Sequence, residues 1–143
     1  GEKDSPFKPF YLTKKNGQTI QVMSKIEYII AKVLDDEGIA FETGPTEFLR
    51  EHHLIPDFKL SIDGETYYWE HLGSMHDLNY RERWYRKFRT YCEKIQIADR
   101  LVTTSEDQKV TDTEKTVKKI VNDLRSGKLA KTEGAYSHHH YYI

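Results

Sequence analysis

Residues 54–73 read LIPDFKLSIDGETYYWEHLG, and this stretch decides the fold that the sequence predicts. Its centre, Asp63-Gly64, is a two-residue turn signal of the type that requires positive φ. The turn joins two runs rich in apolar and aromatic residues, Leu54–Ile62 and Glu65–Leu72. We interpret these runs as the two antiparallel strands of a β-hairpin.

The register of this hairpin opposes two carboxylates. Counting outward from the turn pairs Ile62 with Glu65 and, further along, Asp57 with Glu70. Side chains alternate between the faces of a sheet, so one face is predicted to be core and the other polar. The core face holds Phe58, Leu60, Ile62, Tyr67 and Trp69, and the polar face holds Asp57, Lys59, Ser61, Thr66, Tyr68 and Glu70.

Asp57 and Glu70 are the first candidate site residues. Two like charges on opposed residues destabilise an antiparallel pair. A divalent cation between the carboxylates would offset this repulsion, because Mg²⁺ takes oxygen ligands and is commonly held by one or two carboxylates. The alternative is that both are solvated surface acids, and the spacing alone does not choose between these interpretations.

Two elements are expected before this hairpin. Asn16-Gly17 is another two-residue turn signal, so residues 1–22 are expected to form a β-hairpin that packs on the core. Apolar residues recur at helical spacing over residues 24–37, and Gly38 is placed to end the predicted helix.

The remaining elements follow from the same patterns. A short strand over 39–41 and a connecting loop over 43–53 lead from the first helix to the central hairpin. After the hairpin, a long amphipathic helix is predicted over 77–95 and a strand over 100–104. A third helix is predicted from a capping box at Thr111 to Gly127.

This order of elements predicts the α/β class, with a small mixed sheet flanked by helices and an N-terminal β-hairpin. The core is assigned to residues 23–127. Residues 128–143, which include the run His138–His140, show no periodic pattern and are expected to form a loosely ordered tail. We therefore expect a single domain overall.

Composition limits the function classes. The 143 residues are enough for one domain with a real core. A formal charge of -1 argues against a general nucleic-acid coat protein. The single cysteine, Cys92, excludes an internal disulfide, so a cytoplasmic location is expected. No run approaches the roughly 18 apolar residues of a membrane helix, so no membrane partner is expected.

Basic residues gather in the helix predicted over 77–95. Between Arg81 and Lys94 the chain has six basic residues and two acidic ones. Such a helix face is a candidate surface for phosphate, and an ordinary solvated face is the alternative. The candidate nucleic-acid-binding residues are Arg83, Lys94, Arg86 and Lys59.

Two further candidates lie beside the apolar stripes of the helices. Glu27 borders the stripe of the first helix, so it could lean toward the sheet. The alternative is a capping box, because Ser24 and Glu27 have the Ser-x-x-Glu spacing. Lys87 occupies the matching border position in the helix over 77–95, where its charge could meet phosphate or an attacking water.

Together these residues resemble the PD-(D/E)XK nuclease superfamily, the restriction-endonuclease-like fold, and in particular the branch found as nuclease domains attached to bacterial DNA helicases. The resemblance covers about residues 22–106 and is carried by Ser24–Glu27, Ile55–Phe58, Tyr68–Gly73, Tyr80, Trp84, Lys87 and Tyr91. It implies that Asp57 and Glu70 bind Mg²⁺ or Mn²⁺ and that Glu27 completes the metal site.

One position departs from the family pattern. The family places a lysine two residues after the second acid, whereas this chain has Leu72 there. Leucine cannot orient a water or stabilise a developing charge. Lys87 is the first candidate for this task, since the branch resembles cases in which the lysine moves to the following helix, and Lys59 is the second. His71 points to the opposite face, so we expect it to be packed and hydrogen-bonded.

The leading hypothesis is a metal-dependent nuclease that hydrolyses phosphodiester bonds of DNA. A helicase-type protein and a second copy of the chain are further partner hypotheses. The alternative is a catalytically impaired nuclease-like fold that acts as a nucleic-acid-binding or protein-interaction module. A metal enzyme built on histidines is disfavoured, because the spacings of His52, His53, His71 and His76 match no compact zinc motif.

Overall fold

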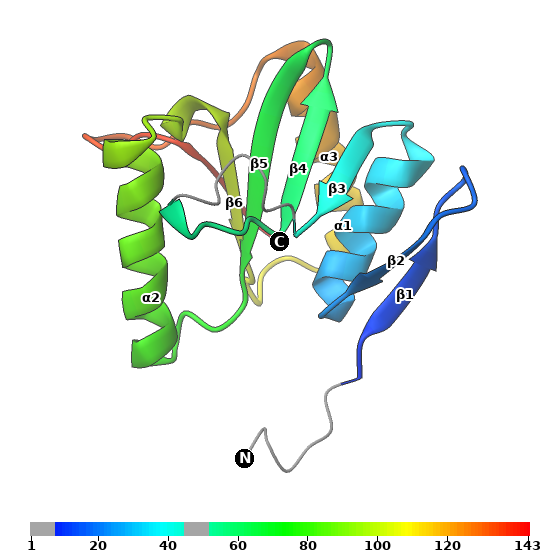
Figure 1. Ribbon diagram of the computed structural model, residues 1–143, viewed down its shortest axis with the longest axis horizontal. Coiled ribbons are helices and arrows are strands. Elements are labelled where there is room, and N and C mark those ends of the chain that lie inside the picture. Colours follow the sequence, from blue (N-terminus) through cyan, green and yellow to red (C-terminus); the bar gives the residue numbers. More distant parts are fainter. Residues whose placement is uncertain (1–7, 45–51) are drawn as a thin grey trace.

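The computed structural model describes residues 8–44 and 52–143. Its main body is a five-stranded mixed sheet with helices on both faces, accompanied by a two-stranded hairpin (Figure 1). In the order in which they pair, the sheet strands are β3 (Ala40–Thr43), β4 (Phe58–Ile62), β5 (Glu65–Leu72), β6 (Leu101–Ser105) and β7 (His139–Tyr142). The first three run antiparallel, while β5, β6 and β7 run parallel. The predicted α/β class with a small mixed sheet is confirmed.

The central hairpin has the predicted register but a shorter first strand. Phe58 pairs with Trp69 and Ile62 with Glu65, and the turn residues Asp63 and Gly64 have φ of 51° and 79°. The strand begins at Phe58, so the prediction that it begins at Leu54 is wrong. Pro56 has no N–H to donate to a ladder, which accounts for the late start. Asp57 and Glu70 therefore lie just beyond the β4–β5 ladder, although Glu70 still pairs with Thr103 of β6.

The N-terminal hairpin and the first helix are close to their predicted positions. Strands β1 (Phe10–Thr13) and β2 (Thr19–Val22) pair antiparallel, and their buried residues Leu12 and Val22 join the main core. Helix α1 (Lys25–Asp36) begins after Ser24, whose Oγ accepts the backbone N–H of Glu27 at 3.1 Å. This hydrogen bond satisfies a helix N–H that would otherwise lack a partner.

The main core lies between one face of the sheet and the helices α1 and α3 (Thr113–Ser126). Phe58 and Leu60 are fully buried there, and each contributes roughly 1.5–3 kcal/mol through its burial. The rings of Phe58 and Trp69 meet edge to face, with centroids 6.4 Å apart. The core face predicted from the hairpin is thus buried, apart from Tyr67, which is half-buried.

The other face of the sheet is not simply polar. It carries a second apolar cluster under helix α2 (Leu78–Arg89), formed by Leu54, Tyr68, Leu72, Trp84, Tyr91 and Leu101. Helix α2 is shorter than the helix predicted over 77–95, because a π-helical turn over Thr90–Lys94 follows it. Gln96 then takes a positive φ of 59°, and a short 3-10 helix over Ala98–Arg100 leads into β6.

Helix α3 is capped by a different residue than predicted. Asp112, not Thr111, is the N-cap, and its carboxylate accepts the N–H of Lys115 at 3.0 Å. The cap and the N–H that it binds are three residues apart, as in the predicted box, but both are shifted by one residue. At the other end, Gly127 adopts the left-handed conformation with φ of 71°, as a helix-ending glycine does.

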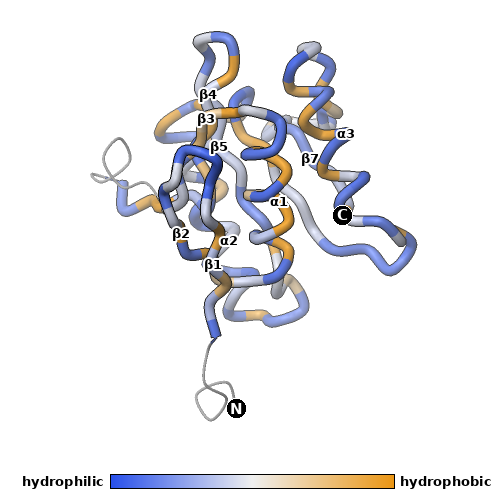
Figure 2. Tube along the Cα trace, turned by 90° about the vertical axis from the view of Figure 1, so that its right-hand side faces the viewer, coloured by the Kyte–Doolittle hydropathy of each residue, from blue (hydrophilic) through white to orange (hydrophobic). Residues whose placement is uncertain are grey.

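The C-terminal segment is ordered, so the prediction of a loose tail over 128–143 is wrong. Strand β7 pairs parallel with β6, and the segment lies beside α3 (Figure 2). Tyr141 donates a hydrogen bond to Asp123 at 2.7 Å, and Ile143 is buried in the main core. The segment lacks an apolar repeat because histidine and tyrosine fill the strand. The imidazole and hydroxyl groups of these residues bind to residues that are distant in the sequence.

The structure also bears on membrane association. Within residues 8–44 and 52–143, no helix is long and apolar enough to cross a membrane.

Candidate functional site

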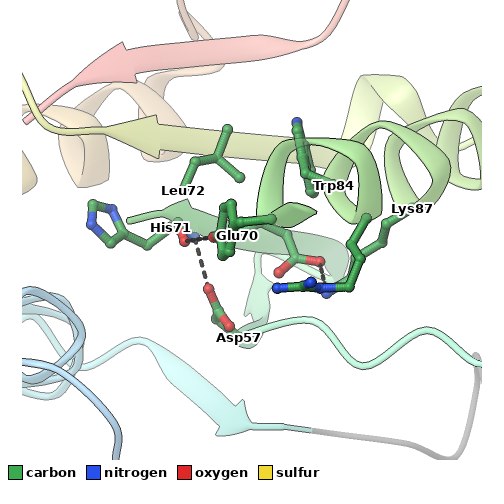
Figure 3. A pocket seen from close by; sticks show the side chains of 8 residues that line it. Asp57, Glu70, His71, Leu72, Trp84 and Lys87 are labelled. Atoms are coloured by element: carbon green, nitrogen blue, oxygen red, sulfur yellow. Dashed lines mark hydrogen bonds and ion pairs between the residues drawn. The ribbon is translucent and has the colours of Figure 1, made fainter. Parts of the chain in front are cut away.

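Asp57 and Glu70 line one cavity on the α2 side of the sheet (Figure 3). We call it the carboxylate cavity; its volume is about 350 Å³, and its walls also include His71, Leu72, Tyr80, Arg83, Trp84 and Lys87. Asp57 is half-buried and lies one residue before β4, while Glu70 is in β5 and only 3% exposed. The hairpin register brings both acids to this end of the sheet.

The Asp57 carboxylate is held by the backbone of the neighbouring strand. Its Oδ2 accepts the N–H of His71 at 2.8 Å, at the point where the ladder between β4 and β5 has ended. Burial raises the pKa of Asp57, and this effect outweighs the opposing influence of the His71 N–H and of Lys87. The remaining oxygen, Oδ1, accepts no hydrogen bond from the described residues.

Glu70 is bound through one of its two oxygens. Its Oε2 accepts hydrogen bonds from Lys87 Nζ at 2.6 Å and from Tyr91 Oη at 2.7 Å. Burial raises the pKa of Glu70 to about 7, with Lys87 lowering it and Asp57 raising it. Near neutral pH this carboxyl is therefore balanced between its protonated and ionised forms. Its Oε1 accepts no hydrogen bond from the part of the chain that the structure describes.

Lys87 lies where the sequence analysis expected it, at the border of the α2 stripe. Its Nζ contacts Glu70 and also donates to the backbone carbonyl of Ile55 at 2.8 Å. The side chain is 27% exposed, so the ammonium lies at the edge of the cavity rather than in its depth. Lys87 thus connects the segment before β4 with β5.

Leu72 and His71 take opposite sides of β5. Leu72 packs in the apolar cluster under α2 and forms an apolar wall of the carboxylate cavity. The ring of His71 points away from Glu70 and Lys87 (Figure 3), and its Nδ1 is 2.9 Å from Thr104 Oγ1. Burial lowers the pKa of His71 to about 4, so the ring is neutral at pH 7. The predicted packed, hydrogen-bonded role of His71 is confirmed.

Glu27 shares a different cavity with Asp57. Ser24 Oγ donates to Glu27 Oε2 at 3.1 Å, so the side chain takes part in the cap of α1. Both carboxylates line this cavity, and burial together with the charge of Asp57 raises the pKa of Glu27. Glu27 does not line the cavity that holds Glu70. Its role as a metal ligand stays a prediction.

Within the described residues, no group of three or more His, Cys, Asp or Glu side chains is arranged to hold a metal ion. The histidine-based site considered above therefore finds no support among them. Any cation at Asp57 and Glu70 would have two carboxylate ligands, with the rest of its coordination supplied by water, backbone oxygen or substrate.

The predicted basic residues lie in three places. Arg83, Arg86 and Lys87 line a cavity of about 370 Å³ beside the carboxylate cavity, together with His52, His53, Leu54, Ile55 and Thr90. We call it the cationic cavity; Arg83 and Lys87 line both. Lys94 lies further along, in a hollow with Arg86 and Arg89. Lys59 lies apart from all three, on β4, with its Nζ 3.9 Å from Glu42.

Two tyrosines at the site carry the family resemblance, but the sequence assigned them no contact with the carboxylates. Tyr91 is fully buried and donates to Glu70, while Tyr80 donates to the His71 carbonyl at 3.4 Å and accepts the Gly73 N–H at 3.3 Å. Burial raises the pKa of Tyr80, and Asp57, Glu70 and Glu27 raise it further. The sequence gives only a weak signal for the hydrogen bonds of these tyrosines. A buried tyrosine, unlike a phenylalanine, needs a partner for its hydroxyl.

Comparison with models of protein families, with curated proteins and with solved structures finds no match for this chain. Inference about its function therefore rests on the geometry described above.

Proposed function

We propose that this protein is a metal-dependent nuclease that hydrolyses phosphodiester bonds of DNA, as a member of the PD-(D/E)XK superfamily. The observation that carries the proposal is the convergence of Asp57, Glu70 and Lys87 on one cavity that borders a cationic one. The resemblance implies a core of one helix, a three-stranded antiparallel meander, a second helix and a further strand, and the order α1, β3–β4–β5, α2, β6 agrees with it. A cytoplasmic location and a helicase-type or identical partner belong to the same hypothesis.

The donor set fits Mg²⁺ or Mn²⁺. Asp57 and Glu70 each use one oxygen for a hydrogen bond within the protein and keep the other without one among the described residues. Hard divalent ions take such oxygen ligands, usually from one or two carboxylates. A bound cation would polarise the phosphate and lower the pKa of a bound water.

The chain's own residues prepare the site for this ion. Glu70 is buried and Asp57 is half-buried, so their carboxylates act in a medium of lower dielectric constant than bulk water. Lys87 places one positive charge at the cavity edge, where negative charge develops on phosphate during hydrolysis. This is the task of the motif lysine that Leu72 cannot perform.

The cationic cavity supports a phosphodiester substrate over other substrates of metal hydrolases. Arg83 and Arg86 lie one α-helical turn apart on α2, so both guanidinium groups border the same hollow. Arginine binds phosphate oxygens in pairs, and such contacts position a nucleic-acid backbone without reading its sequence. Arg89 and Lys94 line the next hollow along the chain, where Glu93 pairs with Arg89 and offsets part of the positive charge.

The test is cleavage of plasmid and single-stranded DNA in Mg²⁺ or Mn²⁺ by the wild type, Asp57→Asn and Glu70→Gln. Glu42→Gln is the matched control, since Glu42 is an exposed glutamate on β3, outside the site. We expect both site variants to lose cleavage and the control to retain it. Unchanged cleavage in both site variants would contradict the proposal. Salt-sensitive DNA binding without cleavage by the wild type would favour the alternative of an impaired nucleic-acid-binding module.

A further inference from the structure

The cavity that Glu27 shares with Asp57 lies on the other side of Asp57 from the carboxylate cavity. We call it the α1 cavity; its volume is about 600 Å³, and it is bordered by the start of α1, the loop after β5, the first turn of α2 and the residue after β6. Pockets of this size commonly hold small organic ligands. Asp57 and Tyr80 line both this cavity and the carboxylate cavity, so a ligand in one would be next to a ligand in the other.

The charge of the α1 cavity is opposite to that of the cationic cavity. Glu27, Asp57 and Glu106 line it, against one basic residue, Lys25. Carboxylates at these positions repel phosphate. The described residues offer no cluster of three ligands for a metal ion here either. The carboxylates do suit a neutral group that presents N–H donors.

The remaining walls combine apolar and aromatic surface from Met23, Ile26 and Tyr80 with the polar residues Ser24, His71 and Ser74 and with Gly73. Met23 is 48% exposed although it is a large apolar residue, Ile26 is half-buried, and the ring of Tyr80 is half-buried between the two cavities. A flat ring with N–H groups on its edge would cover this apolar surface and donate to the carboxylates. Nucleobases have this chemistry, because they stack on aromatic side chains and their amino groups donate to Asp and Glu.

We propose that the α1 cavity binds an unpaired nucleobase next to the phosphate held at the carboxylate cavity. This inference rests on the proposed function, because a nucleotide links its base and phosphate through one sugar. The phosphates that follow would then lie in the cationic cavity. A base inside a duplex is paired and stacked, so it must leave the helix to enter. The protein therefore prefers single strands or frayed ends to intact duplexes.

The test is a binding assay that needs no cleavage. A short single strand carrying one 2-aminopurine is titrated with protein in EDTA and again in Ca²⁺, and an abasic site is then moved along the strand. We expect the abasic site to weaken binding about 5- to 150-fold at one position, the effect of one base stacked on an aromatic ring. An intact duplex should bind more weakly than the single strand.

Three variants test whether the ring of Tyr80, in the wall of the α1 cavity, stacks on the base. Tyr80→Leu should abolish the position dependence, Tyr80→Phe should keep it, and Tyr85→Leu is the control, since Tyr85 is a 50% exposed tyrosine on the same helix. If Tyr80→Leu does not fold, the abasic scan of the wild type decides. A scan without position dependence in both EDTA and Ca²⁺, or absence of single-strand binding in both, overturns the inference.

This result is separable from a failure of the proposed function. Position-dependent binding without any metal-dependent cleavage would sustain the base site and reject the nuclease. Cleavage that depends on Asp57 and Glu70, combined with a flat abasic scan, would sustain the nuclease and reject the base site.

Discussion

The apparent affinity for Mn²⁺ is predicted to rise about tenfold between pH 6 and pH 8, because a proton and a metal ion compete for Glu70. With a pKa of about 7, this carboxyl is ionised in roughly one molecule in eleven at pH 6, half at pH 7 and ten in eleven at pH 8. The change corresponds to about 1.4 kcal/mol of binding free energy. The raised pKa of Asp57 acts in the same direction.

Isothermal titration calorimetry in two buffers of different ionisation enthalpy measures both the affinity and the protons released. We expect about 0.9 protons released from Glu70 per Mn²⁺ at pH 6 and about 0.1 at pH 8. Glu42→Gln should behave as the wild type does. An affinity that is constant across this range, with no proton released at pH 6, would refute the account of Glu70 as a buried metal ligand.

Three further predictions concern the same residues. Without metal, Glu70→Gln should raise the free energy of unfolding at pH 8 by up to about 3 kcal/mol in urea denaturation. The reason is that the raised pKa makes the stability given by protonated Glu70 full below pH 4.5 and lost as pH rises through 7. An unchanged or lower stability of the variant would argue against burial as the cause of the raised pKa. Lys87→Met should lower the rate of metal-dependent cleavage by about 10²- to 10³-fold. Lys32→Met removes an exposed lysine of α1 and should not change the rate. Equal rates in the two variants would remove Lys87 from the mechanism. Because the pKa of His71 is lowered, its neutral ring stabilises the fold above pH 6.5, and this contribution, about 3 kcal/mol, is lost as pH falls through 4. The stability difference between the wild type and His71→Gln should therefore shrink between pH 7 and pH 4, with His76→Gln, at an exposed histidine, as the control. A stability difference independent of pH would contradict the buried, neutral state of the ring.

Local signals predicted much of the fold. The backbone conformation of Asp63-Gly64 is enough to determine the turn. The pairing of Phe58 with Trp69 then follows from counting residues outward from this turn along both strands. The helical spacing of Val117, Ile120, Val121 and Leu124 likewise matches the buried face of α3. The start of β4 was missed because Pro56 limits the ladder, an effect that the apolar pattern of the strand conceals.

Non-local contacts account for the larger errors. Tyr68 and Leu72 are buried because α2 covers the second face of the sheet, and no pattern within β5 reveals that cover. Strand β7 forms by parallel pairing with β6, more than thirty residues earlier in the chain, and its His140 contacts two hydroxyls there, Thr103 Oγ1 at 2.6 Å and Ser105 Oγ at 3.2 Å.

The candidate site was predicted in part. The helical wheel placed Lys87 at the edge of the α2 stripe, and the structure brings its Nζ to Glu70. The bond from Tyr91 to Glu70 could not be derived, because it depends on the π-helical turn after α2. Lys59 shares a strand face with Asp57 in the sequence pattern, yet its long side chain extends to Glu42 on the neighbouring strand.

The central claim is that Asp57 and Glu70 together bind a divalent cation. The most direct test is a crystal soaked in Mn²⁺ and measured for anomalous scattering. The account predicts one anomalous peak between the two carboxylates, within coordination distance of Asp57 Oδ1 and Glu70 Oε1, which disappears in Glu70→Gln. A soaked crystal without a peak there, with Lys87 still paired to Glu70, would contradict the claim.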